Sequence, residues 1–129
     1  MLVRSLSGCG EIVANDFTSL RELLHPERHG VPLGYSLARA VIAPGGRSIR
    51  HHLEGATEVY YLLSGEGTMH IGAESRRVAA GDAVLIPAGA VQFLENTGSA
   101  ALEFLAIVEP AWQPWFDHRD EEPPGGSAA

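Results

Sequence analysis

Residues that favour turns interrupt the sequence at short, regular intervals between Gly34 and Val108. The apolar runs between them have the length of single β-strands and recur about every 8–12 residues, which is typical of sandwiches and barrels. No useful segment of this range has the spacing of an amphipathic helix, which excludes repeated parallel βαβ units. The sequence therefore predicts an all-β fold, with strands at residues 33–43, 48–53, 58–63, 68–71, 74–78, 83–86, 91–95 and 101–108.

The limits of this strand-rich region divide the chain into three predicted parts. Residues 1–32 form an N-terminal arm, in which Phe17 to Leu24 is compatible with a helical turn or an edge strand. Residues 33–112 form a barrel, and residues 113–129 form an acidic, Pro/Gly-rich tail that is expected to be flexible and disordered. Inside the barrel, Ser64-Gly-Glu-Gly67 is predicted to be a hairpin turn that pairs residues 68–71 with the preceding strand.

Composition excludes several classes of protein. The chain has 129 residues, the size of one domain, and its net charge of -7 with scattered arginines argues against nucleic acid as a partner. No apolar stretch approaches the roughly 18 residues of a membrane span, and no signal peptide is recognisable, so a cytoplasmic protein is expected. The single cysteine, Cys9, excludes an internal disulfide, and the absence of lysine excludes a lysine Schiff base.

Two stretches of the chain, residues 44–67 and 81–96, carry spaced motifs. Glu58 and Gly65 end the first motif, and the second contains Gly81, Pro87, Gly89 and Asn96. Together they resemble the two consensus motifs of the cupin superfamily. The resemblance implies a single-domain double-stranded β-helix, or jelly-roll barrel, whose interior holds one small-molecule ligand. It also implies a homodimer that forms through outer strands.

The first motif can be read in two frames because Gly45 and Gly46 are adjacent. From Gly45, the first family histidine is His51 and a leucine replaces the second. From Gly46, the first histidine is His52 and a glutamate replaces the second. Side chains alternate across a strand, so these histidines are expected to face opposite sides. We favour His51 as the inward residue, because Leu53 then packs in the core, and keep His52 as the alternative.

The resemblance implies a metal site, since cupins typically bind a metal ion through three histidines and one glutamate. Here Gln92 replaces the histidine of the second motif, so the candidate ligands are His51 or His52, Glu58 and Gln92. Imidazole and carboxylate suit Zn, Mn, Fe or Ni, whereas a carboxamide oxygen is a weak neutral ligand. The alternative is a metal-free pocket in which hydrogen bonds satisfy Glu58 and Gln92 is a neutral donor.

These residues suggest two functions of different class. The first is a metal-assisted enzyme, of isomerase, lyase or decarboxylase type, acting on a sugar derivative or carboxylic acid. Glu58 would be a ligand or general base, and Tyr60, on the same strand face, would line the cavity. The second is a non-catalytic binding or sensing barrel that has lost its metal, which is suggested by the missing histidines.

Overall fold

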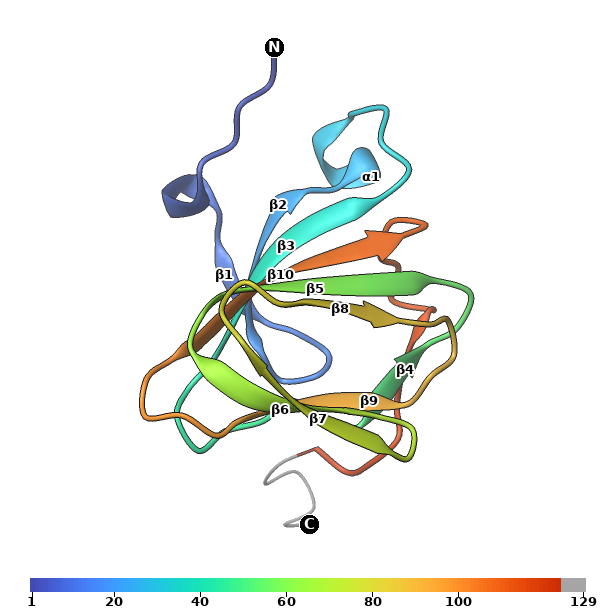
Figure 1. Cartoon of the computed structure of the whole chain (residues 1–129). Helices are drawn as coiled ribbons and strands as arrows, with labels where there is room; N and C mark the ends of the chain where they lie inside the picture. Colours follow the sequence, from blue (N-terminus) through green and yellow to red (C-terminus); the bar gives the residue numbers. More distant parts are fainter. Residues whose placement is uncertain (124–129) are drawn as a thin grey trace.

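Two antiparallel sheets face each other in the computed structural model, which describes residues 1–123 (Figure 1). The six-stranded sheet has the order β1 (Glu11–Val13), β2 (Ser19–Leu24), β3 (Ser36–Ile42), β10 (Leu102–Glu109), β5 (Thr57–Ser64) and β8 (Ala83–Ile86). The five-stranded sheet has the order β11 (Asp117–Arg119), β4 (His51–Leu53), β9 (Gln92–Asn96), β6 (Glu66–Ile71) and β7 (Glu74–Ala79). The predicted all-β fold is confirmed.

The core lies between the sheets and follows from strict alternation along the central strands. In β3 and β10, every second side chain is buried, as expected where one face of a sheet meets the core and the other meets solvent. Phe104 of β10 is fully enclosed and packs against the ring of Tyr60 with their centroids 4.6 Å apart. The remaining core members are Ala40, Ile42, Leu62, Met69, Val78, Ile86, Leu94, Leu102 and Ala106.

The predicted hairpin at Ser64-Gly-Glu-Gly67 is wrong. β5 pairs with β10 and β8, whereas β6 pairs with β7 and β9, so the chain crosses from one sheet to the other at this point. Gly65 has a φ of 87° and lies against the backbone of Ala101, leaving no room for a side chain. The glycines that suggested a tight turn therefore serve a crossing between sheets.

The segment Phe17 to Leu24, left open between helical turn and edge strand, contributes a strand. β2 pairs with β1 on one side and β3 on the other, so β1 is the edge of the sheet. The helices are short: η1 (Leu6–Gly8) precedes β1, and α1 (Pro26–His29) connects β2 to β3. Across the described residues, no helix has the length and apolar character needed to cross a membrane.

The predicted disordered tail, residues 113–129, contains the ordered strand β11, which corrects the expectation for residues 117–121. β11 pairs antiparallel with β4, and the carboxylate of Glu121 accepts hydrogen bonds from both terminal nitrogens of Arg47, at 2.7 and 3.0 Å. It also accepts one from the backbone N–H of Arg50 at 2.6 Å. The strand pairing of β11 with β4 and the ion pair of Glu121 with Arg47 keep this acidic segment ordered. Residues 124–129, also in the predicted tail, lie outside the described part of the chain.

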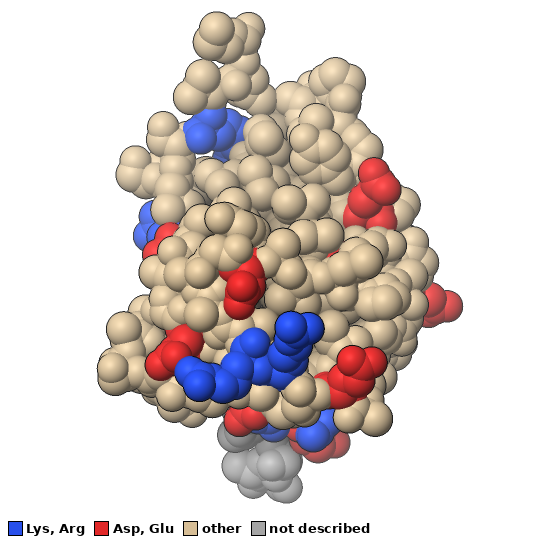
Figure 2. Space-filling view, in the orientation of Figure 1, with Lys and Arg blue, Asp and Glu red and all other residues tan. Residues whose placement is uncertain are grey.

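Charged side chains are dispersed over the face of the molecule shown in Figure 2. A small group of arginine side chains is flanked by carboxylates there, and no broad basic surface is visible on this face. The ion pair of Arg77 with Glu66, at 2.9 Å, is an example of this mixing. Nothing on this face has the continuous positive charge that a nucleic-acid backbone requires.

Candidate functional site

A cavity of about 190 Å³ lies inside the barrel, and we call it the barrel cavity. Its walls come from β1, β2, β3, β5 and β10 of the larger sheet, from β4 and the start of β11 of the smaller one, from the loop between β1 and β2, and from α1. Much of the wall is apolar, with Leu20, Ala38, Ala40, Leu53, Phe104, Ala106, Val108 and Trp112 among its members. Its polar lining residues include His51, Glu58, Tyr60, Asp16 and Asp117.

His51 points into the barrel and is 2% exposed. Its Nδ1 lies 2.7 Å from the carbonyl oxygen of Ile49, and because a carbonyl can only accept, Nδ1 carries a proton. The other nitrogen, Nε2, lies 3.6 Å from Oδ2 of Asp16. Burial alone would lower the pKa of His51, but the Asp16 carboxylate and the Ile49 hydrogen bond outweigh it and raise that pKa.

Glu58 of β5 is buried at the cavity wall beside His51. Gln92, the register partner of His51 on β9, donates its side-chain Nε2–H to Oε1 of Glu58 at 2.8 Å. Burial raises the pKa of Glu58 from 4.5 to about 7, although the Gln92 hydrogen bond and His51 act in the opposite direction. Tyr60 lies two residues further along the same strand face, and its burial raises the pKa of the phenol well above 10.

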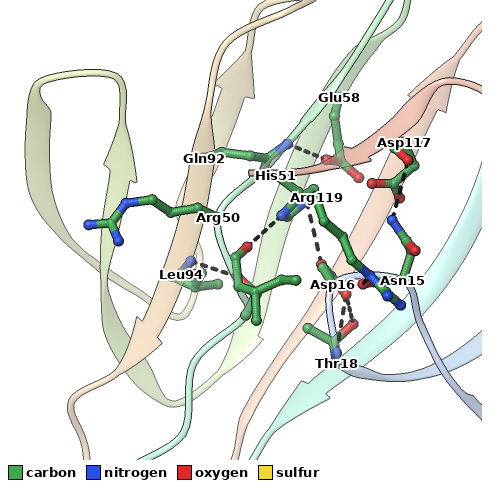
Figure 3. A network of polar contacts seen from close by, with 12 residues as sticks. Asn15, Asp16, Thr18, Arg50, His51, Glu58, Gln92, Leu94, Asp117 and Arg119 are labelled. Carbon is green, nitrogen blue, oxygen red and sulfur yellow. Dashed lines mark hydrogen bonds and ion pairs between the residues drawn. The ribbon is translucent and has the colours of Figure 1, made fainter. Parts of the chain in front are cut away.

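Two aspartates that the sequence reasoning missed complete the polar group (Figure 3). Asp16 lies in the β1–β2 loop, where its Oδ1 accepts hydrogen bonds from the backbone N–H and hydroxyl of Thr18, at 3.1 and 2.8 Å. Asp117 opens β11, and its Oδ2 accepts a hydrogen bond from Nε1 of Trp112 at 3.0 Å. The only local signal was Asp16-x-Thr18, a sequence typical of an Asx turn, which does not indicate a site.

Hydrogen bonds connect the β1–β2 loop to β11 beside the barrel cavity. The side-chain amide of Asn15 donates to the carbonyl oxygen of Asp117 at 3.4 Å, and Nε of Arg119 donates to the carbonyl oxygen of Asn15 at 2.9 Å. The guanidinium of Arg119 also lies over the Phe17 ring, 5.0 Å from its centroid. These contacts join segments from the two ends of the chain on one side of the site.

His52 lies outside this site, which corrects its inclusion among the candidate ligands. It occupies the opposite face of β4 from His51, because adjacent residues of a strand alternate. Its Nδ1 is 2.8 Å from Oδ2 of Asp120, and its ring stacks on that of His118 with centroids 5.0 Å apart. The favoured frame, with His51 inward, is the one the structure places at the barrel cavity.

The residues at the barrel cavity do not fit the predicted Zn, Mn, Fe or Ni ion. Within residues 1–123, no group of three or more His, Cys, Asp or Glu side chains is arranged to hold a metal ion. Leu53 occupies the second ligand position and offers only methyl groups, while the amide nitrogen of Gln92 is engaged by Glu58. Oε1 of Gln92 is buried without a hydrogen-bond partner, but a neutral amide oxygen is a weak ligand for these ions.

The sequence profile of the cupin domain matches residues 38–108, more than half of the chain. The chain belongs to the cupin superfamily. The match covers His51, Glu58, Tyr60 and Gln92 but neither Asp16 nor Asp117. This cupin therefore builds its site partly from segments on either side of the matched domain.

Similar proteins include an uncharacterized protein of Methanocaldococcus jannaschii, 33% identical over 111 residues, with 85% of this cupin and 84% of that protein covered. An oxalate-binding protein of Thermotoga maritima is 39% identical over 71 residues, 55% of this chain and 59% of that protein. Among solved structures, a predicted oxalate decarboxylase from Thermotoga maritima aligns with a TM-score of 0.74 at 29% identity, covering 84% and 99% of the two chains.

Proposed function

We propose that this cupin binds a small polar organic molecule in the barrel cavity and transfers a proton to or from it, with Glu58 as the acid–base group. The observation that carries the proposal is a buried carboxyl at the cavity wall whose pKa is raised to about 7. A group with this pKa gives and accepts a proton near neutral pH with comparable ease. Isomerisation, elimination and decarboxylation each need such a transfer, and they are the reaction types we expect.

The neighbours of Glu58 have separate parts in this proposal. Gln92 fixes the orientation of the carboxyl through its hydrogen bond to Oε1. The raised pKa of His51 favours its protonated form, and its Nε2, beside Asp16, is the ring nitrogen that faces the ligand. Tyr60 remains a neutral hydroxyl, because its pKa lies well above 10. The apolar wall keeps water away from these groups and strengthens their interactions with the ligand.

A second candidate is a binding barrel without catalysis. The relative from Thermotoga maritima that is named an oxalate-binding protein favours this function. Leu53 and Gln92, which replace two histidines of the family pattern, also favour it, because a site without its metal ligands can still bind. In this case Glu58 and His51 would recognise the ligand and would not exchange protons with its carbon atoms.

Two measurements test the proposal in sequence. A thermal-shift screen of sugars, amino sugars, polyols and small carboxylic acids identifies ligands that raise the melting temperature. Each ligand is then incubated with the protein in D2O, and deuterium incorporation at carbon is followed by NMR. Exchange in the wild type that disappears in Glu58→Gln supports proton transfer. Binding without exchange supports the second candidate, and no binding by any compound contradicts both.

The quaternary structure that we propose is a homodimer formed through the outer face of the six-stranded sheet. Tyr61, Leu63 and Leu85 project from that sheet with exposed fractions of 41%, 42% and 65%. Neighbouring exposed apolar side chains on a sheet commonly mark an association surface. Light scattering on the wild type and on Leu85→Glu tests the proposal, and a monomeric wild type contradicts it.

A further inference from the structure

We propose that Asp16 and Asp117 make the barrel cavity selective for a ligand that carries an amine, and against dicarboxylates such as oxalate. The inference rests on the proposed binding function and adds to it the chemical class of the ligand. Both aspartates line the cavity, and both come from outside residues 38–108, which match the cupin domain. They therefore lie outside the segment that the family profile covers.

The charges that line the barrel cavity are unbalanced. Four acidic side chains, those of Asp16, Glu22, Glu58 and Asp117, line it beside two basic ones, those of Arg28 and His51. Arg28 is already paired with Glu22, at 2.6 Å.

His51 lies closest to Asp16, at 3.6 Å. Among the described lining residues, Asp117 then remains without a cation of its own, whereas Glu58, whose pKa is raised to about 7, is partly protonated near neutral pH. A positively charged group on the ligand would balance this negative charge.

Asp117 offers a specific place for such a ligand. Its Oδ2 accepts from Trp112, but its Oδ1 is buried and has no hydrogen-bond partner. A buried acceptor is costly unless a donor reaches it, and an ammonium group has three donors and a full charge. Asp16 and Asp117 line the same cavity as His51 and Glu58, and Figure 3 draws these four residues close together.

The same arrangement disfavours an anion. Each carboxylate of a ligand would meet the like charges of Asp16 and Asp117 in a place with little water to screen them. His51 alone attracts a ligand carboxylate only weakly, because the neighbouring Asp16 carboxylate offsets the positive charge of its protonated ring. The apolar side chains of Leu20, Phe104 and Trp112 leave room for the uncharged body of an amine. Similar proteins are named for oxalate, and we infer that this cupin differs from them in ligand charge.

The test compares probes of matched shape and different charge on the full-length protein. The first series is glucosamine, glucose and glucuronate, and the second is ethanolamine, ethylene glycol, glycolate and oxalate, all at equal concentration and ionic strength near pH 7. We expect the amine of at least one series to raise the melting temperature by about 3 °C or more, and to exceed its neutral and anionic counterparts. The anions should produce no rise.

Isosteric variants assign the selectivity to the two aspartates. Asp16→Asn keeps an oxygen for Thr18, and Asp117→Asn keeps one for Trp112, so both variants should fold. The rise in melting temperature with the amine should shrink in each and vanish in the double variant. Glu74→Gln makes the same change of charge on an exposed residue of β7 and should leave the rise unchanged.

Three results would overturn the inference. In the first, oxalate or another anion stabilises the wild type more than the matched amines do. In the second, the shift caused by the amine persists in the double variant. Either leaves the proposed binding function standing, because a ligand has still bound. In the third, no probe of any charge changes the melting temperature, and the proposed binding function fails together with the inference.

Discussion

Gln92 of β9 donates its side-chain Nε2–H to Oε1 of Glu58 on β5, and this 2.8 Å hydrogen bond joins the two sheets through the interior of the barrel. The family pattern has a histidine where Gln92 stands. An amide holds the glutamate in place without adding a charge that would keep it ionised. The pKa of Glu58 can therefore stay near 7, where the carboxyl exchanges protons readily.

Glu58→Gln should change how stability depends on pH. The folded-state pKa of about 7 exceeds the ordinary 4.5, so the stability associated with protonated Glu58 is complete below 4.5 and is lost as pH rises through 7. The difference in free energy of unfolding, wild type minus variant, should fall by about 3 kcal/mol over this range. Urea denaturation of both proteins at a series of pH values measures it, and parallel curves would contradict the assignment.

Asp16→Asn should lower the pKa of His51. The carboxylate 3.6 Å from Nε2 is the main cause of the raised value, while burial opposes it. Histidine side-chain NMR as a function of pH reports the titration directly. His51 should titrate above 6.5 in the wild type and at a lower pH in the variant. An unchanged His51 titration would exclude the proposed effect of Asp16.

Purified protein should contain substoichiometric metal, and a chelator should not change its melting temperature. The reason is the donor set: Leu53 replaces one histidine and Gln92 another, and no described cluster of ligands compensates for them. Elemental analysis of the wild type beside His51→Ala and His52→Ala checks this. Stoichiometric metal that disappears only in His51→Ala would establish a metal site in the barrel and refute the assignment.

Gly67→Ala should destabilise the protein by about 2 kcal/mol, within the range for overpacked sites. A methyl group at Gly67 would run into the carbonyl oxygen of Glu95 on the neighbouring strand β9, which cannot move without breaking the ladder. Gly34→Ala serves as the control, since nothing lies within 4 Å of the added carbon there. Chemical denaturation measures the free energy of unfolding of both variants. Equal values would show that the backbone near Gly67 shifts to accept the methyl group without loss of stability.

Glu121→Gln should loosen β11 without unfolding the barrel. The hydrogen bonds from Arg47 hold the pKa of Glu121 at about 2, so the carboxylate is ionised throughout the ordinary pH range. Hydrogen–deuterium exchange should be faster for the backbone amides of residues 117–120 in the variant, while β10 keeps its protection. Glu122→Gln is the neighbouring control, and similar exchange in both variants would show that Glu121 is dispensable.

The sequence predicted the barrel because local patterns determine it. Short apolar runs, turn glycines and the two cupin motifs located most strands, and alternation along β4 and β5 separated His51 from His52 and aligned Tyr60 with Glu58. Which strands pair was harder to predict. The glycines near residue 65 predict a hairpin, but the same residues permit both a tight turn and a crossing between sheets, and the structure has the crossing.

The aspartates of the site could not be predicted, because neither has a distinctive local pattern. Asp16 reaches His51 across 35 residues of sequence, and Asp117 reaches the cavity only because β11 pairs with β4. The composition of the tail suggested disorder, and composition does not reveal that Glu121 binds Arg47. Asp16 and Asp117 are placed at the cavity by tertiary contacts between residues far apart in the sequence, which local patterns do not reveal.

The position of β10 has a consequence for how the chain folds. This strand lies between β3 and β5, although it is formed by residues 102–109, near the C-terminus. The centre of the larger sheet therefore stays open during synthesis until residues 102–109 have emerged. Pairings between strands distant in sequence fold slowly, on a scale of about milliseconds to seconds. Until β10 enters, the exposed edges of β3 and β5 are available to other chains, so aggregation competes with folding in this interval.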